Sequence, residues 1–333
     1  MDDLLTHALR QLLQDQCTPT LVRRIERGEA PAALWRRLEE SGFADALVGE
    51  EQGGAGLALR EVFPLIELCG SFALPVPLAE TMLARAQLAA MDLARPAGSI
   101  AFALCATAVD GGGLRCAHVP SGRVADWVLV QRPSECLLLP VAHAASAPSV
   151  FPLDATLEWG AAAVAAAPRL LGQHDLVTLQ ACVSAAQLAG ALMSVFTRTL
   201  QYANERNQFG RPIGKFQAIQ HQLAVLSEQA VAARMAAQIG CHAEGFAPDR
   251  LRVAVAKART SEAALEVAAL SHSIHGAIGF TEAYDLQLYT RRLHAWRLVA
   301  GSESHWHGVL GQELIYSREG PSLDLLRATT DID

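Results

Sequence analysis

The stretch from Arg206 to Gln217 is a polar, glycine-containing corner between two long helical patterns. Upstream of it, apolar residues recur every three or four positions, at Leu179, Cys182, Val183, Ala186, Ala189, Met193, Phe196, Leu200 and Ala203. The same period restarts downstream at Phe216, Ile219, Leu223, Leu226, Ala230, Ala233 and Ala237. Gly210, Pro212 and Gly214 end one helix and permit a turn before the next. A turn accounts for these residues, but not for the arginine, the glutamines and the phenylalanines of the corner.

The C-terminal part of the chain, residues 173–333, is predicted to be an antiparallel helical bundle. The periodicity predicts helices near 176–206, 216–244, 249–272 and 285–317. Gly245 is expected to end the second helix, and Asp249 to cap the third. The first helix carries so few charges that we expect it to be buried on several sides, including against another subunit.

The two segments before residue 173 have different sequence patterns. Residues 1–95 read as helices broken by loops at Gly53–Gly56 and at the prolines of 74–77. Residues 96–172 contain short apolar runs at 100–106, 125–131 and 135–141, separated by glycine, proline and serine, which is typical of strands. The fold class predicted is therefore mainly α with a small central β domain.

Charge and cysteine content exclude several classes of protein. The chain has 27 basic and 34 acidic residues and no basic run, so we do not expect nucleic acid as a partner. Its seven cysteines show no CxxC spacing, which favours reduced core residues over disulfides or a zinc site. No apolar run is judged long enough to span a membrane, and MDDLLTHALRQLL lacks the order of a signal peptide, so a cytoplasmic location is expected.

Three blocks of the sequence resemble the acyl-CoA dehydrogenase family. NERNQFGRPIGKFQAIQHQLA is similar to the family's corner between two helices, and IHGAIGFTEAYDLQLYTRRLHAWRLVAGSESHW (274–306) to its late glycine motif and following helix. LWRRLEESGFADALVGEEQGGAGLALREVFPLIELCGSFALPVPLAE (34–80) resembles its N-terminal helical segment. The resemblance implies an N-terminal helical domain, a β domain and a C-terminal four-helix bundle, and implies FAD as cofactor.

In this family FAD is shared between two subunits, and the resemblance assigns this chain only one half of the site. Arg206 matches the arginine that binds the diphosphate, Phe209 and Gln217 match adenosine contacts, and Gly276 matches a glycine that lets the backbone approach the cofactor. Two neighbouring positions depart from the family pattern, with Ser273 in place of a glutamine and Ala277 in place of a second glycine.

The other half of the flavin site, which the β domain supplies, lacks its family motifs. SIAFALCATAVDGGGLRC stands where a threonine-glutamate-proline and glycine-serine-aspartate loop is expected. The stretch 117–120 replaces the strand that lines the flavin ring. Hydrogen bonds to the ring edge can therefore be assigned to no residue of this chain.

The resemblance also locates two positions for a catalytic base, and neither holds a base here. Ala300 occupies the usual glutamate position, and Gln180 occupies a second position 26 residues before the corner arginine. The nearest carboxylates in the sequence, Glu303 and Asp175, are interpreted as surface or capping residues. Of the five histidines His272, His275, His294, His305 and His307, the last two are two residues apart and would point to different sides of a helix. No carboxylate or cysteine cluster completes a site, so no metal binding is predicted.

The function expected from these features is that of a base-lacking subunit of a heteromeric, FAD-dependent acyl-CoA dehydrogenase. The resemblance is to the short subunits of bacterial heterotetrameric enzymes that desaturate steroid side-chain CoA thioesters. It implies a longer partner subunit carrying the base, an acyl-CoA substrate and an electron-transfer flavoprotein as electron acceptor. Three alternatives remain open: a self-sufficient homomeric dehydrogenase with a relocated base, a non-enzymatic assembly subunit, and a flavin monooxygenase of the same fold.

Overall fold

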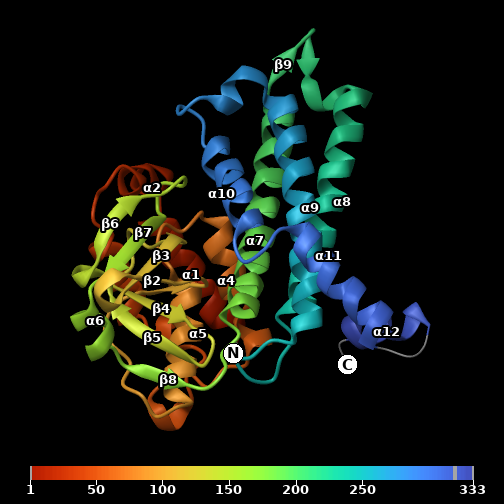
Figure 1. The fold of residues 1–333 in the computed structure, drawn as a ribbon. Helices are drawn as coiled ribbons and strands as arrows, with labels where there is room; N and C mark the ends of the chain where they lie inside the picture. Colours follow the sequence, from red (N-terminus) through yellow and green to blue (C-terminus); the bar gives the residue numbers. More distant parts are fainter. Residues whose placement is uncertain (1, 318–320, 332–333) are drawn as a thin grey trace. The chain divides into compact units, whose positions relative to one another are not determined.

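The computed structural model describes residues 2–317 and 321–331 (Figure 1). Backbone contacts divide the chain into two units. The first comprises Met1–Leu65, Leu74–Gln180 and Ala243–Ala247, and the second comprises Ile66–Ala73, Ala181–His242 and Pro248–Asp333. The sheets belong to the first unit and the long helices mainly to the second, so the fold is mainly α with a small β domain, as the sequence predicts.

The first unit begins with helices that the N-terminal pattern predicts only in outline. They are α1 (Asp2–Gln16), α2 (Pro19–Glu26), α3 (Ala32–Glu40), α4 (Leu59–Ser71), which continues into the second unit, and α5 (Leu78–Ala89). Thr18 caps α2, because its side chain accepts a hydrogen bond from the amide of Leu21 and Pro19 follows at the first helical position. Every residue of α5 is buried, which makes this helix the centre of the unit.

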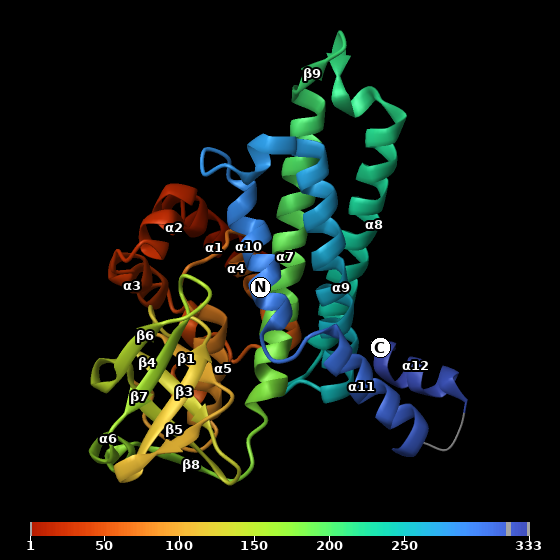
Figure 2. The same ribbon diagram turned by 45° about the horizontal axis from the view of Figure 1, so that its top comes forward.

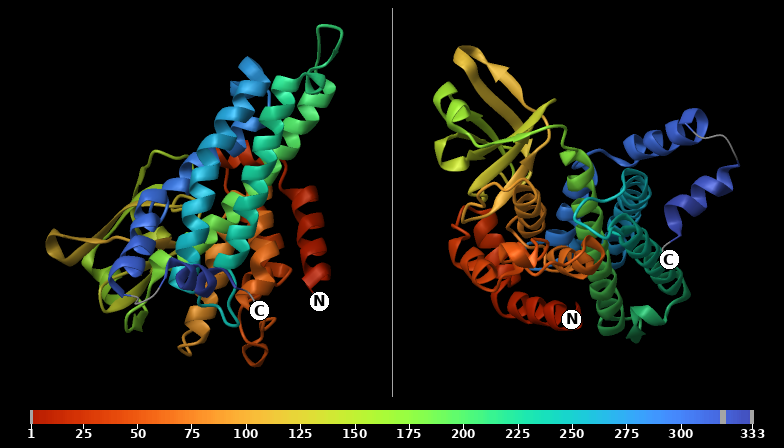
Figure 3. Two further views of the ribbon diagram at one scale, coloured as in Figure 1. Left: turned by 90° about the vertical axis from the view of Figure 1, so that its right-hand side faces the viewer. Right: turned by 90° about the horizontal axis from the view of Figure 1, so that it is seen from below.

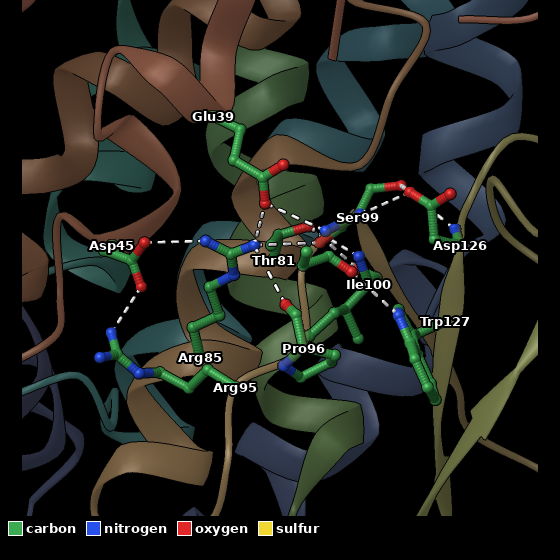
Figure 4. A network of polar contacts seen from close by, with 12 residues as sticks. Glu39, Asp45, Thr81, Arg85, Arg95, Pro96, Ser99, Ile100, Asp126 and Trp127 are labelled. Atoms are coloured by element: carbon green, nitrogen blue, oxygen red, sulfur yellow. Dashed lines mark hydrogen bonds and ion pairs between the residues drawn. The ribbon is translucent and has the colours of Figure 1, made fainter. Parts of the chain in front are cut away.

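A polar network on α5 connects the helix to the start of the first strand (Figure 4). Arg85 is buried and donates hydrogen bonds to Glu39, to Asp45 at 2.7 Å, and to the carbonyls of Pro96 and Gly98. Thr81, one turn before Arg85, accepts a hydrogen bond from the amide of Ile100 at 2.8 Å. The guanidinium is therefore compensated by two carboxylates, which is the condition for burying a charge.

Two four-stranded sheets form the β domain. One has the order β1 (Ile100–Ala103), β4 (Trp127–Gln131), β5 (Glu135–Pro140), β8 (Arg169–Leu171); the other has the order β2 (Thr107–Val109), β3 (Gly113–Val119), β7 (Ala155–Trp159), β6 (Ala145–Pro148). All pairings are antiparallel except that of β1 with β4. Side chains from both sheets form one hydrophobic core, as in a sandwich. The sequence predicts β1, β4 and β5, whereas the short, exposed β2 and β6 escape the apolar pattern.

Long helices dominate the second unit (Figures 1 and 2). They are α7 (Leu176–Glu205), whose first turn belongs to the first unit, α8 (Gln217–Gly240), α9 (Arg250–His275) and α10 (Leu286–Leu298), followed by α11 (Glu303–Gln312) and α12 (Ser322–Thr330). Asp249 caps α9 as predicted, accepting hydrogen bonds from the amides of Leu251 and Arg252 at 2.9 Å. The helix α6 (Ala161–Ala166) is a short element of the β domain.

Two predicted helix ends in this unit are wrong. Helix α8 ends at Gly240 and not at Gly245, because the cap residue Cys241 already closes its last turn. The predicted helix 285–317 is broken into α10 and α11, because Ala300 and Gly301 both adopt left-handed backbone, with φ of 56° and 99°. A right-handed helix cannot continue through two such residues, so α11 begins anew at Glu303.

The apolar helix α7 corrects a further expectation. By length and composition it could cross a membrane, contrary to the reading that no apolar run is long enough. However, 89% of its most apolar window is buried inside the protein, which is typical of a core helix. Close backbone contacts explain its small residues: a Cβ at Gly190 would lie 1.9 Å from the carbonyl oxygen of Glu67, and one at Gly70 equally close to that of Gln187.

Candidate functional site

The corner after α7 is a short β-hairpin with a two-residue loop (Figure 3, left). Its strands are β9 (Asn207–Gln208) and β10 (Arg211–Pro212), paired antiparallel, with Phe209 and Gly210 between them. Both central residues have positive φ, 51° and 80°, as a type I′ hairpin turn requires. Glycine adopts this backbone without cost, whereas a phenylalanine does not, and the Phe209 side chain is 90% exposed. Its ring meets only that of Phe216, edge to face at 6.1 Å, among the rings of the described residues, so most of its surface is left for another molecule.

The other polar side chains of the corner also face outward. Arg206 and Gln217 are both exposed, and the Arg206 guanidinium has no hydrogen-bond or ion-pair partner among residues 2–317 and 321–331. The backbone around it is nevertheless fixed, since the carbonyl of Arg206 accepts a hydrogen bond from the amide of Ile213 at 2.8 Å. A fixed backbone therefore presents a cation and an aromatic ring to the outside.

The late glycine motif lies at the C-terminal end of α9. Gly276 ends the helix with φ 63° and ψ −147°, a combination that residues with a Cβ avoid, and a Cβ built there would meet no atom within 4 Å. Ser273 and Ala277 are exposed beside it. Because Ala277 has negative φ, its methyl group causes no backbone strain at the position where the family has a second glycine.

A stack of aromatic rings joins this motif to the corner. The rings of Tyr202 and His275 are stacked at 4.3 Å, and the Tyr202 hydroxyl donates to the carbonyl of His275 at 3.4 Å. Arg206 lies one helical turn beyond Tyr202, and Gly276 directly follows His275. The second unit therefore brings both predicted cofactor-binding segments to the same end of its bundle (Figures 1 and 2).

The corner that contains Ala300 is closed by the protein's own polar groups. The Trp306 indole donates to the Ala300 carbonyl at 3.0 Å. The ammonium of Lys257, which is fully buried, donates to the carbonyls of Arg297 at 2.8 Å and Gly301 at 3.0 Å, and to Ser261. Burial lowers the pKa of Lys257 to about 7. Three acceptors around one nitrogen nevertheless match the three N–H groups of a charged lysine.

Both carboxylates near the two expected base positions already have partners within the chain. Burial would raise the pKa of Glu303, but the hydrogen bond from Arg297 and the charges of Arg297 and Lys257 outweigh it, so this pKa lies below its usual value. Asp175 accepts hydrogen bonds from the amide and the hydroxyl of Thr178, at 3.0 and 2.6 Å, as a helix cap does. The capping role that the sequence predicts for Asp175 is confirmed.

Gln180, at the second base position, has a partner that sequence reasoning missed. Its side-chain amide donates to Glu80 at 3.1 Å, and both residues are buried. Burial raises the pKa of Glu80, and the hydrogen bond from Gln180 acts in the opposite direction without outweighing it. The signal available in the sequence was a lone glutamate in the otherwise apolar run before Met82.

Other parts of the chain offer less for chemistry. The stretch 117–120, which replaces the flavin-lining strand, is irregular in β3: the register shifts between Cys116 and Val119, and His118 has φ 51°. A cavity of about 790 Å³ beside Arg85 and Arg95 is lined by residues of the first unit and by none of the predicted site residues.

Within the described ranges, no three histidine, cysteine, aspartate or glutamate side chains are grouped to hold a metal ion. Six cysteines are buried as predicted, but Cys105 is exposed.

Comparison with known proteins identifies the family. Residues 2–96 match the acyl-CoA dehydrogenase N-terminal domain, and residues 176–313 match the acyl-CoA dehydrogenase C-terminal domain. The chain belongs to the acyl-CoA dehydrogenase family. Members of this family are FAD-dependent flavoproteins.

Relatives within the family include two mycobacterial acyl-CoA dehydrogenases and a steroid ACAD. Acyl-CoA dehydrogenase IpdE2 of Mycobacterium tuberculosis is 32% identical over 264 residues, covering 79% of this chain and 80% of its own. IpdE2 of Mycolicibacterium smegmatis is 30% identical over 303 residues, which cover 90% of this chain and 94% of the relative. A variant of the Tcur3481–Tcur3483 steroid ACAD has a similar structure, with a TM-score of 0.81, 26% identity and 95% and 98% coverage. The ChsE4–ChsE5 complex of M. tuberculosis shares the fold, with a TM-score of 0.83 at 24% identity and 96% and 98% coverage.

Proposed function

We propose that this acyl-CoA dehydrogenase works as one subunit of a heteromeric enzyme, holding the diphosphate and adenosine of FAD while a partner subunit supplies the catalytic base. The observation that carries the proposal is the contrast between two sets of residues. The proposed cofactor-binding set is exposed, and the Arg206 guanidinium has no partner among the described residues. The usual base position of the family, Ala300, carries only a methyl group.

The residues at the corner fit the cofactor half assigned to them. Arg206 offers a guanidinium to the two phosphates, Phe209 and Gln217 offer an aromatic face and an amide to the adenosine, and Gly276 leaves open space for a close approach to its backbone. Ser273 and Ala277 lie beside Gly276 and would complete this half. When bound, FAD would accept a hydride from the acyl-CoA substrate. The residues of this chain would then bind and orient the cofactor and move no proton.

The substrate class follows from the relatives alone. Because IpdE2 and a steroid ACAD are similar over most of the chain, we propose a CoA thioester derived from a steroid, such as a steroid side-chain CoA. The partner would be a longer acyl-CoA dehydrogenase subunit, and the reduced flavin would pass its electrons to an electron-transfer flavoprotein.

The visible absorbance of the purified protein tests this proposal. The chain expressed alone is expected to be colourless, and the chain co-expressed with its partner is expected to hold about half a flavin per polypeptide. A full flavin on the chain alone, with turnover of an acyl-CoA, would overturn the shared-site proposal. A colourless complex would instead favour an assembly role, and flavin- and oxygen-dependent hydroxylation would identify a monooxygenase.

One observation favours a second candidate, a self-sufficient dehydrogenase with a relocated base. Glu80 is a buried carboxyl hydrogen-bonded to Gln180, and burial raises its pKa, which is the direction a general base in this family requires. If the chain alone were active, Glu80→Gln would lower kcat by a factor of about 10² or more. Retained turnover in Glu80→Gln would remove Glu80 from the chemistry.

A further inference from the structure

His275 is a buried side chain at the cofactor-binding end that no predicted role explains. It is 4% exposed, and its Nδ1 lies 2.8 Å from the carbonyl oxygen of Ser271, one turn earlier in α9. A carbonyl can only accept, so Nδ1 carries the hydrogen, and Nε2 is left as an acceptor. Nε2 has no hydrogen-bond partner in the part of the chain that the structure describes. The neutral form is also the one that burial favours, because burial lowers the pKa of His275.

The imidazole ring belongs to a cluster drawn from three segments. Tyr202 in the last turns of α7 stacks on it at 4.3 Å with an interplanar angle of 22°, and Tyr284, just before α10, lies at 5.1 Å with a tilt of 54°. Tyr202 and Tyr284 also meet edge to face at 5.9 Å. We call Tyr202, His275 and Tyr284 the ring cluster. Each pair lies at a distance and angle at which aromatic rings attract one another.

The ring cluster sits where two cofactor-binding segments begin. Tyr202 is four residues before Arg206 on a rigid helix, and His275 is bonded through the chain to Gly276. Since the Arg206 amide donates to the Tyr202 carbonyl at 2.8 Å, the stack sets how far the backbone of Arg206, from which its guanidinium extends, lies from the exposed backbone of Gly276. A single diphosphate-containing ligand that spans both groups would depend on this separation.

We propose that His275 is a positioning residue for the cofactor half-site: as a neutral ring stacked on Tyr202 it sets the spacing between Arg206 and Gly276, and so governs affinity for the diphosphate-adenosine part of FAD. This inference rests on the proposed function. It goes beyond it because His275 touches the two binding segments and not the cofactor.

A matched control is available one turn away. His272 is also near the glycine motif and also stacked, on Phe280 at 4.2 Å, and its Nε2 lies 3.0 Å from the Thr290 hydroxyl. It does not bridge to α7. His272→Leu should therefore disturb the local structure as much as His275→Leu does, without changing the spacing between the two segments.

The test is flavin binding by the apo complex, measured separately with FAD and with FMN, which lacks the adenosine part. His275→Leu is expected to raise the Kd for FAD about tenfold and to leave the Kd for FMN within about twofold. His275→Phe, which keeps the stacked ring, should recover most of the affinity, and His272→Leu should stay close to the wild type. If His275→Leu does not fold, Tyr202→Leu removes the other ring of the stack and should give the same FAD-selective loss.

Two results would overturn the inference. Equal losses for FAD and FMN would mean that His275 supports only the assembly of the complex, and an unchanged Kd for FAD would mean that the stack does not position the site. A wild-type complex that binds neither flavin would be recognised separately, because it contradicts the proposed function itself.

Discussion

The two glycine-containing corners of the second unit treat their polar groups in opposite ways. At the corner from Arg206 to Gln217, the backbone is fixed but the side chains face outward and the guanidinium has no partner in the described parts of the chain. At the corner around Ala300, the carbonyls all accept hydrogen bonds from buried side chains. Lys257 donates to the carbonyls of Arg297 and Gly301, and Trp306 donates to that of Ala300. The first corner leaves its polar side chains available to another molecule, which is what the proposed function requires, and the second uses its polar groups to hold its own shape.

The difference separates side chains that the fold needs from side chains that it does not. The corner around Ala300 keeps its shape because buried backbone groups must stay paired. The exposed side chains of Arg206 and Phe209 have no such structural cause, since they lie outside the core. Their presence therefore argues for a binding role.

The largest effect is expected on stability, when the buried ammonium of Lys257 is removed from the corner around Ala300. Lys257→Met leaves the carbonyls of Arg297 and Gly301 without their donor, and we expect the free energy of unfolding to fall by about 3 kcal/mol. Urea denaturation of the purified protein measures it. Lys215→Met at the exposed corner is the control and should change stability by less than about 0.5 kcal/mol. Similar losses in both variants would contradict the contrast between the corners.

The pH dependence of stability tests whether Lys257 is charged in the corner around Ala300. The pKa of Lys257 is about 7 in the folded protein, against 10.5 for the free side chain. Between these values the unfolded chain binds the extra proton, so stability should rise with pH by up to about 1.4 kcal/mol per unit from this group. The rise should be absent in Lys257→Met when both proteins are unfolded in urea at pH 7, 8 and 9. Identical slopes would show that the three acceptors keep Lys257 charged throughout.

At the open corner the expected loss is in binding and not in stability. Arg206→Ala should weaken FAD binding by the complex about tenfold or more, because a charge-assisted contact to phosphate is removed, while the melting temperature of the apo protein stays within about 1 °C. Flavin absorbance after gel filtration gives the occupancy. Unchanged occupancy would remove Arg206 from the site. Arg211→Ala tests a neighbouring cation, which stacks on Phe216 at 4.2 Å and is expected to matter less.

The smallest effect is expected for a single hydrogen bond of the closed corner. Trp306→Phe keeps an aromatic ring in the core but removes the donor to the Ala300 carbonyl, which should cost about 1 kcal/mol of unfolding free energy. Flavin occupancy of the complex should not change. A loss of flavin in this variant would connect the two corners and weaken the distinction drawn between them.

The sequence by itself determined the helical corner, the strands with continuous apolar runs and the cap at Asp249, because each depends on local periodicity or on a residue type with one strong preference. It also identified Ala300 and Gln180, since the absence of a carboxylate can be read directly. Only the tertiary structure decided that the last predicted helix breaks at Ala300 and that α8 ends at Gly240. The reason is that the carbonyls at these points have side-chain donors that no periodicity encodes: Lys257 and Trp306 bond the corner at Ala300 and Gly301, and the Cys182 thiol bonds the carbonyl of Gly240. The contacts of Glu80 with Gln180 and of His275 with Tyr202 join residues separated by 100 and 73 positions, and no local pattern encodes such pairings.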